Sequence, residues 1–146
     1  MTKNEQIVRR GYDIAEKQDA EGFIGTFTPD GEFTNEALGV TYHGRDVAIP
    51  MIFAKAFPDM HRELHNVYVD GDTVVVELLL QGTHNGPLEL PMGTVPPTGK
   101  RMNAPCCDVF RLKDGKVRTF NCYPSAAVML AQLGVLANLQ ASLQTE

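Results

Sequence analysis

Asp108 is the residue of this chain best suited to acid–base chemistry. It lies in a run of strand-forming residues followed by Asp114-Gly115, a dipeptide typical of a two-residue hairpin turn, and then by a second such run. If the turn lies at these two residues, Leu112 is opposite Val117 and Asp108 is opposite Asn121.

Because side chains alternate across a sheet, this register divides the hairpin into two faces. The first face is apolar near the turn and polar further out, as in one wall of a ligand pocket. A carboxylate on such a wall loses hydration, which favours a raised pKa and a role as general base. The alternative is a structural aspartate bonded to Asn121 or to a loop backbone. The first face comprises Leu112, Phe110, Asp108, Cys106 and Ala104 opposite Val117, Thr119, Asn121, Tyr123 and Ser125.

Further candidates lie at the ends of predicted strands. His84 is the second catalytic candidate because it titrates near neutral pH, although it could instead fix the loop that follows it. The predicted substrate-binding residues are Asn35, Glu36, Asn121, Tyr123 and Ser125. Three of them also have ordinary interpretations: Glu36 as a solvated acid, Tyr123 as a core residue with its hydroxyl at the edge, and Ser125 as a helix N-cap.

No spacing typical of a metal site or a phosphate-binding loop occurs on any single predicted element. The cysteines Cys106, Cys107 and Cys122 form no CxxC pair. Cys107 and Cys122 lie opposite each other in the predicted register, so a disulfide is conceivable, but nothing marks the chain as secreted and free buried thiols are favoured. We therefore predict that no metal and no organic cofactor is required.

Length and composition point to one soluble globular domain. The chain has 146 residues, 43% of them hydrophobic and 21% charged, with a formal net charge of −5. Mixed charges with an acidic excess argue against nucleic acid or an anionic membrane as the main partner. No signal peptide and no apolar run long enough to span a membrane is recognisable, so we expect a cytoplasmic protein.

Hydrophobic periodicity predicts the elements that position these residues. An amphipathic helix over Asn4–Lys17 is followed by a short helix capped by Asp19, and the chain ends with a Ser125–Gly134 helix and a tail over Val135–Leu143. Between them we predict a turn at Thr28–Gly31, a strand from Glu32, strands at Met60–Val69 and Thr73–His84, and a loop over Asn85–Lys100. A third helix ends near Phe57; it either kinks at Pro50 or, as we favour, begins at Pro50 after a short turn. This order predicts an α+β fold: a curved, mostly antiparallel sheet with helices on its concave face.

Five segments occur in the order and approximate spacing of a known family. They are Phe57–Asp59 (FPD), Gly82–Pro87 (GTHNGP), Pro96–Lys100 (PPTGK), Asp108–Val117 (DVFRLKDGKV) and Ala131–Gly134 (AQLG). With them the chain resembles the SnoaL-like polyketide cyclases of the nuclear transport factor two superfamily, which also contains ketosteroid isomerase, limonene epoxide hydrolase and scytalone dehydratase. The resemblance implies a single cone-shaped α+β domain, a cystatin-like barrel enclosing a ligand pocket.

The resemblance also implies a function. Members of this cyclase family take a proton from a carbon beside carbonyl groups and close a ring by an aldol-type step without a cofactor. The family's usual acid is replaced here by Ser125, and its usual tryptophan by Asn121. We therefore expect a polyketide cyclase acting on a small hydrophobic carbonyl compound with Asp108 as base. The alternatives are a non-catalytic binding protein on the same fold, or an isomerase, dehydratase or epoxide hydrolase.

The second hairpin face predicts a homodimer. It carries Val109, Cys107, Phe120 and Cys122, which is too apolar for a free sheet surface.

Overall fold

A six-stranded sheet in the order β2-β1-β8-β7-β4-β3 forms one wall of the protein in this computed structural model, which describes residues 1–136 apart from the side chains of residues 52–54. Neighbouring strands are antiparallel except β1 and β8, which run parallel. The strands are β1 (Phe27–Asn35), β2 (Val40–His43), β3 (His61–Asp70), β4 (Thr73–Thr83), β7 (Arg101–Lys113) and β8 (Lys116–Pro124). The predicted fold class is confirmed.

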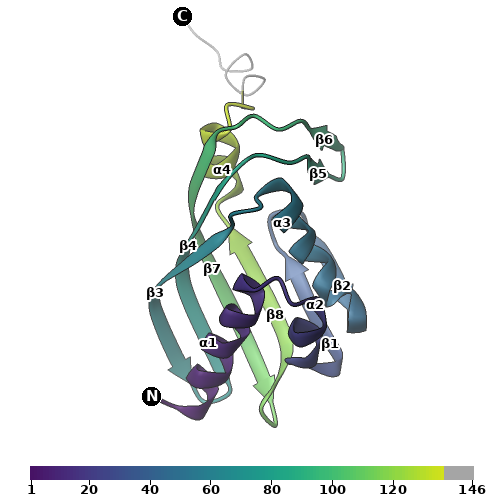
Figure 1. The fold of residues 1–146 in the computed structure, drawn as a ribbon. Helices are drawn as coiled ribbons and strands as arrows, with labels where there is room; N and C mark the ends of the chain where they lie inside the picture. The colour runs from purple at the N-terminus through teal and green to yellow at the C-terminus, as the bar shows by residue number, and fades with distance from the viewer. Residues whose placement is uncertain (137–146) are drawn as a thin grey trace, which may run out of the picture.

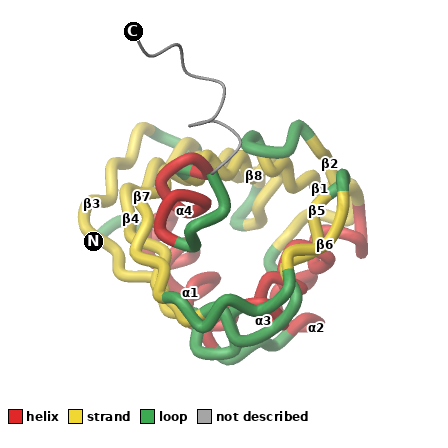
Figure 2. Tube along the Cα trace, turned by 90° about the horizontal axis from the view of Figure 1, so that it is seen from above, coloured by secondary structure: helices red, strands yellow, loops and turns green. Residues whose placement is uncertain are grey.

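The helices cover the concave face of this sheet (Figure 1). They are α1 (Lys3–Glu16), α2 (Ala20–Gly25), the 3-10 helix η1 (Gly44–Ile52), α3 (Phe53–Ala56) and α4 (Ala126–Gln132). Seen from above, the curved sheet makes one part of a ring that α2 and α3 complete, with α4 over one end (Figure 2). No described helix has both the length and the apolar character that crossing a membrane demands.

Local sequence explains the first two helices. The side chain of Thr2 accepts a hydrogen bond from the backbone N–H of Glu5, and that of Asp19 accepts one from Gly22, so each helix begins at a capping residue. Helix α1 buries Val8, Tyr12 and Ala15. Both predictions are confirmed, and this stripe places Tyr12 above the sheet.

Three predicted elements differ from the structure. The expected turn at Thr28–Gly31 lies inside β1, where the register with β8 shifts between Phe27 and Glu32. Pro50 lies inside the 3-10 helix η1 rather than at the start of a helix, and the proline removes one backbone donor from it. The predicted loop over Asn85–Lys100 contains a small ribbon of β5 (Leu88–Leu90) and β6 (Gly93–Val95).

The predicted helix after the hairpin is present as α4, and Gly134 beyond it has a φ of 75°, as expected for a residue that ends a helix. Residues 137–146 of the predicted tail lie outside the described residues.

Candidate active site

A bulge in the β7–β8 hairpin decides which side chains enter the protein. Leu112 pairs with Val117 as predicted, but the register shifts between Leu112 and Arg111, and Asp108 pairs with Cys122 instead of Asn121. A shift of one residue moves side chains to the other face of a sheet. The predicted register was therefore wrong beyond the bulge, and Phe120 and Cys122 share the face of Asp108.

Asp108 lies in a row of aligned residues on three neighbouring strands. Cys122 on β8 pairs with Asp108 on one side and with Asn35 on β1 on the other. Two strand spacings therefore separate Asn35 from Asp108, or about 10 Å between their Cα atoms. Asn35 and Asp108 are 6% and 3% exposed, respectively, so the row carries a buried amide and a buried carboxyl group.

The next row towards the hairpin turn is aromatic. Phe33, Phe120 and Phe110 pair across the same three strands. The ring centroids of Phe120 lie 4.4 Å from Phe33 and 4.2 Å from Phe110. The polar row therefore borders a packed apolar wall that excludes water from it.

Tyr12 holds one oxygen of the Asp108 carboxyl group. Its hydroxyl donates to Asp108 Oδ2 at 2.6 Å, while Oδ1 faces the Cys106 thiol at 3.4 Å. Burial raises the pKa of Asp108, and the hydrogen bonds from Tyr12 and the thiols, together with the charge of Arg62, partly oppose this. Burial, followed by the charge of Asp108, raises the pKa of Tyr12 well above its ordinary value, so the phenol stays a donor.

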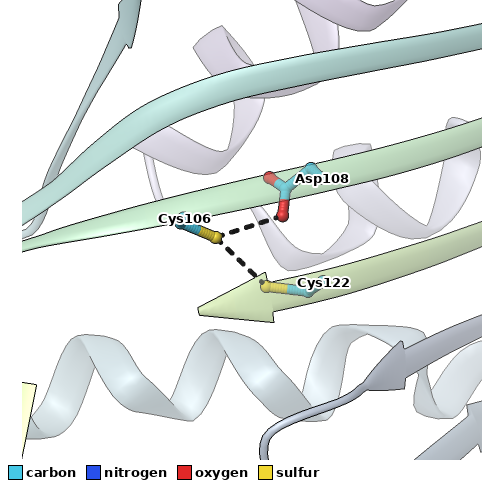
Figure 3. A group of neighbouring side chains, drawn as sticks. All are labelled: Cys106, Asp108 and Cys122. Carbon is cyan, nitrogen blue, oxygen red and sulfur yellow. Dashed lines mark hydrogen bonds between the residues drawn. The ribbon is translucent and has the colours of Figure 1, made fainter. Parts of the chain in front are cut away.

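Two thiols lie beside this carboxyl group (Figure 3). The Sγ atoms of Cys106 and Cys122 are 3.7 Å apart, and both cysteines and Cys107 are free, in agreement with the prediction. The hydrogen bond with Cys106 and burial raise the pKa of Cys122 well above that of an ordinary thiol. Cys107 lies on the other face of β7, opposite Tyr123.

The row opens into a cavity of about 120 Å³. Apolar side chains form most of its lining, and its polar lining groups include Tyr12, Asn35, Arg62 and Asp108. Arg62 is itself paired with Glu16 at 3.3 Å. A cavity of roughly 150 Å³ is known to hold one benzene molecule, so this space suits a compound of about one small ring.

His84 fixes the loop that follows β4, which is the second of the two roles considered for it. Its ring is fully buried, and Nδ1 contacts the Thr98 hydroxyl at 3.0 Å and accepts from the Thr98 N–H at 3.2 Å. It therefore fixes the loop before β7 and is not part of the cavity lining. Burial lowers its pKa, which keeps the ring neutral.

Of the predicted substrate-binding residues, one lines the cavity and four do not. Asn35 lines the cavity, with Oδ1 accepting from the N–H groups of Ala37 and Leu38. Asn121 lies on the opposite face from Asp108, where its Nδ2 donates to Glu36 Oε1 at 2.8 Å. Tyr123 is 48% exposed on that outer face. Ser125 is the N-cap residue of α4, as predicted, but its side chain makes no cap hydrogen bond. The cavity lining includes none of Glu36, Asn121, Tyr123 and Ser125.

Sequence analysis missed Tyr12, Arg62 and Cys122 as residues of this site. One signal was available for Cys122: the apolar residues Val117, Phe120 and Cys122 are three and then two apart, and an interval of three inside a strand indicates a bulge. Tyr12 gave no such signal, because it meets Asp108 across 96 positions of sequence.

The sequence of residues 8–120 matches the model of the SnoaL-like domain. The chain belongs to the SnoaL-like domain family. A comparison with curated proteins found no match.

Several solved structures have a fold similar to that of this SnoaL-like protein. A protein from Jannaschia sp. CCS1, provisionally named a SnoaL-like polyketide cyclase, is 28% identical, with a TM-score of 0.75 over 90% of this chain and 92% of that chain. AclR from Streptomyces galilaeus, provisionally named a hydroxylase, is 25% identical, with a TM-score of 0.75 over 90% and 95%. A Catenulispora acidiphila protein of ketosteroid isomerase-like fold, bound to trimethylamine, is 21% identical, with a TM-score of 0.74 over 90% and 95%.

Proposed function

We propose that this SnoaL-like protein is a cofactor-independent enzyme that forms an enolate from a small hydrophobic carbonyl compound and closes a ring by an aldol-type step. The observation that carries the proposal is the buried Asp108 carboxyl group, held by Tyr12 at the wall of an apolar cavity. The raised pKa of Asp108 suits a general base, because an ideal base has a pKa near the operating pH.

In the first step Asp108 removes a proton from the carbon beside a carbonyl group. The C–H electron pair becomes the C=C bond of the enolate, and the carbonyl electron pair moves to oxygen. Oδ1 is the proposed acceptor for this proton, since Oδ2 accepts the short hydrogen bond from Tyr12, whereas the contact of Oδ1 to the weakly donating Cys106 thiol is long. The Tyr12 bond keeps the carboxylate in one orientation while the proton moves.

Asn35 is the proposed donor to the enolate oxygen. Its side-chain oxygen is occupied by two backbone N–H groups, which turns the Nδ2 group away from the Ala37–Leu38 turn. Among the described residues none accepts a hydrogen bond from this Nδ2, so it is open to a ligand. Asn35 and Asp108 line the same cavity on either side of Cys122, so a carbonyl compound held over Cys122 lies within reach of both side chains.

Ring closure completes the reaction. The enolate carbon attacks a second carbonyl carbon of the same substrate and forms the new C–C bond, while the electron pair of that C=O bond moves to its oxygen. The protonated Asp108 returns its proton to this alkoxide, so the carboxylate is restored. The apolar walls fold the substrate and exclude water, which would otherwise protonate the enolate first.

A binding protein on the same fold is the second candidate. Ser125 stands where the family's usual acid is expected, and the cavity would suit a small apolar ligand whether or not it reacts. A ligand that co-purifies with the protein and leaves unchanged would favour this candidate over the enzyme.

The test is exchange of carbon-bound hydrogen in D2O. Cyclohexanone, a ketone of one ring, is the probe, and NMR follows deuterium entering beside its carbonyl group. We expect the wild-type protein to accelerate exchange and Asp108→Asn to reduce that acceleration by about 100-fold or more. Asp30→Asn, at an exposed aspartate, is the matched control and should keep the wild-type rate.

Two results would overturn the proposal. If Asp108→Asn exchanges as fast as the wild type, another group is the base. If the wild type accelerates no exchange in cyclohexanone or in smaller and larger cyclic ketones, while native mass spectrometry shows these ketones bound, the protein is a binding protein.

A further inference from the structure

Three side chains that commonly bind metals converge beside the cavity, whose lining includes Asp108 and Cys122. Cys106 and Asp108 are two residues apart on β7, and Cys122 pairs with Asp108 from β8, so all three share the concave face. One ligand atom from each lies within 4.8 Å of the others (Figure 3). We propose that Cys106, Asp108 and Cys122 form a binding site for a thiophilic divalent metal ion such as Zn²⁺.

The distances between these atoms match a tetrahedral ion. With Zn–S bonds of about 2.3 Å and a Zn–O bond of about 2.0 Å, a tetrahedral centre has a sulfur–sulfur edge of about 3.8 Å and a sulfur–oxygen edge of about 3.5 Å. The corresponding separations are 3.7 Å between Cys106 Sγ and Cys122 Sγ, and 3.4 Å between Cys106 Sγ and Asp108 Oδ1. Two edges of the polyhedron are therefore in place before an ion binds.

Tyr12 acts as an outer partner of this site. Its hydroxyl bonds Asp108 Oδ2 and leaves Oδ1 directed at the sulfur atoms. Metal-bound carboxylates usually have such a hydrogen-bonded partner, which fixes the orientation of the ligand. Because Asp108 and Cys122 line the cavity, a fourth coordination position would open towards it, as in sites where three protein ligands leave room for a small molecule.

Charge also fits. Two thiolates and a carboxylate around a divalent ion leave a net charge of −1, and Arg62 lines the same cavity. The hydrogen bond with Cys122 lowers the pKa of Cys106, but burial raises the pKa of both Cys106 and Asp108 so that each is raised on balance, and the positive charge of Arg62 partly opposes this. Binding releases the two thiol protons, and that of Asp108 where it is protonated, to solvent, so affinity must rise with pH.

This inference does not rest on the proposed function, because metal binding is measured without turnover. We predicted no metal site from the sequence because no typical metal-ligand spacing occurs on a single predicted element. The three ligands proposed here come from two strands, and the bulge brings them to the same face. The carboxylate oxygen involved is the proposed base, so the metal-bound protein would lack a free base.

The experiment is a titration of the full chain with Co²⁺ and then Zn²⁺. The protein is purified without an affinity tag, kept reduced with a phosphine, treated with a chelator, and titrated at pH 8. We expect one equivalent of Co²⁺ to give a thiolate-to-cobalt charge-transfer band and the visible bands of a tetrahedral ion, and Zn²⁺ to abolish both.

Variants locate the site. Cys106→Ser and Cys122→Ser should each weaken binding by about 100-fold or more and reduce the charge-transfer band, because loss of a ligand costs more than loss of an outer partner. Asp108→Asn should weaken binding while leaving the thiolate band, which keeps the test valid if one serine variant fails to fold. Cys107→Ser is the matched control, since Cys107 lies on the opposite face of the same strand.

Three outcomes would overturn the inference. These are no charge-transfer band in the wild type, a band that is unchanged in Cys122→Ser, and a band that is lost in Cys107→Ser. The third outcome would assign binding to an outer-surface thiol.

Discussion

The hydrogen bond between Tyr12 and Asp108 gives the most direct test of the site. Tyr12→Phe removes the donor at 2.6 Å and leaves the ring that packs edge-on against Phe110. The contribution to the carboxylate is about 1.5–3 kcal/mol, the range for a buried hydrogen bond to a charged group. Each 1.4 kcal/mol changes an equilibrium tenfold, so Asp108 should bind its proton roughly 10- to 100-fold more tightly in the variant.

The expected result is a change in the pH profile of cyclohexanone exchange. Because more of the carboxyl group is protonated at a given pH, exchange by Tyr12→Phe should fall by up to roughly 100-fold at the acid end of the profile and recover as pH rises. A purely structural role for Tyr12 would instead lower the rate by the same factor at every pH.

Tyr68→Phe is the matched control. Its hydroxyl also donates to a carboxylate, Glu77 Oε1, at 2.9 Å, but on the exposed outer face of the sheet. The same substitution there should leave the profile unchanged. An identical acid limb in wild type and Tyr12→Phe would refute the reasoning that Tyr12 stabilises the carboxylate form of the base.

Three further predictions concern stability and assembly. Burial raises the pKa of Asp108 in the folded state, so its contribution to stability is fully present below the unfolded-state pKa and is lost as pH rises through the folded-state pKa. In urea unfolding, Asp108→Asn should therefore lose less free energy of unfolding than the wild type between acidic and neutral pH, and an equal loss would contradict this. Ser125→Ala should change the free energy of unfolding by less than about 0.5 kcal/mol, because Ser125 makes no side-chain cap bond, whereas a loss of about 1 kcal/mol or more in the same assay would indicate such a bond. The homodimer stays a prediction, but part of its basis is corrected: Phe120 and Cys122 lie on the concave face with Asp108, so of the predicted apolar face only Val109 and Cys107 remain on the outer side. Light scattering at micromolar concentration giving the mass of one chain would exclude the homodimer.

The sequence predicted the elements of the fold well, because each has a local cause. Thr2 and Asp19 cap their helices, Gly134 follows the end of α4, and the Asp114-Gly115 turn joins β7 and β8. These features depend on residues that are neighbours in the chain, so their chemistry is visible before folding.

The site was predicted only in part, because its geometry depends on one bulge. Counting pairs from a hairpin turn gives the correct face only while both strands advance together, and Arg118 has no partner on β7 in the register. Asp108 was predicted on the correct face because β7 continues regularly, with every second residue buried from Met102 to Leu112. Asn121 and Tyr123 were predicted on the cavity side because β8 does not continue regularly, and its bulge turns them to the outer face.

The same bulge explains how the buried Asp108 is accommodated. In the regular register Asn121 and Tyr123 would face the cavity, and their amide and hydroxyl groups could bind the carboxyl group directly. With the bulge, the neighbouring positions hold a thiol and an aromatic ring, both poor partners for a charge, and the good donor comes from Tyr12 on α1. A carboxyl group with one strong donor and weakly donating thiols keeps a raised pKa and one available oxygen. That oxygen can take a proton from carbon or bind a metal ion with the two sulfur atoms, but not both at once, so the proposed catalysis and the proposed metal binding exclude each other in a single molecule.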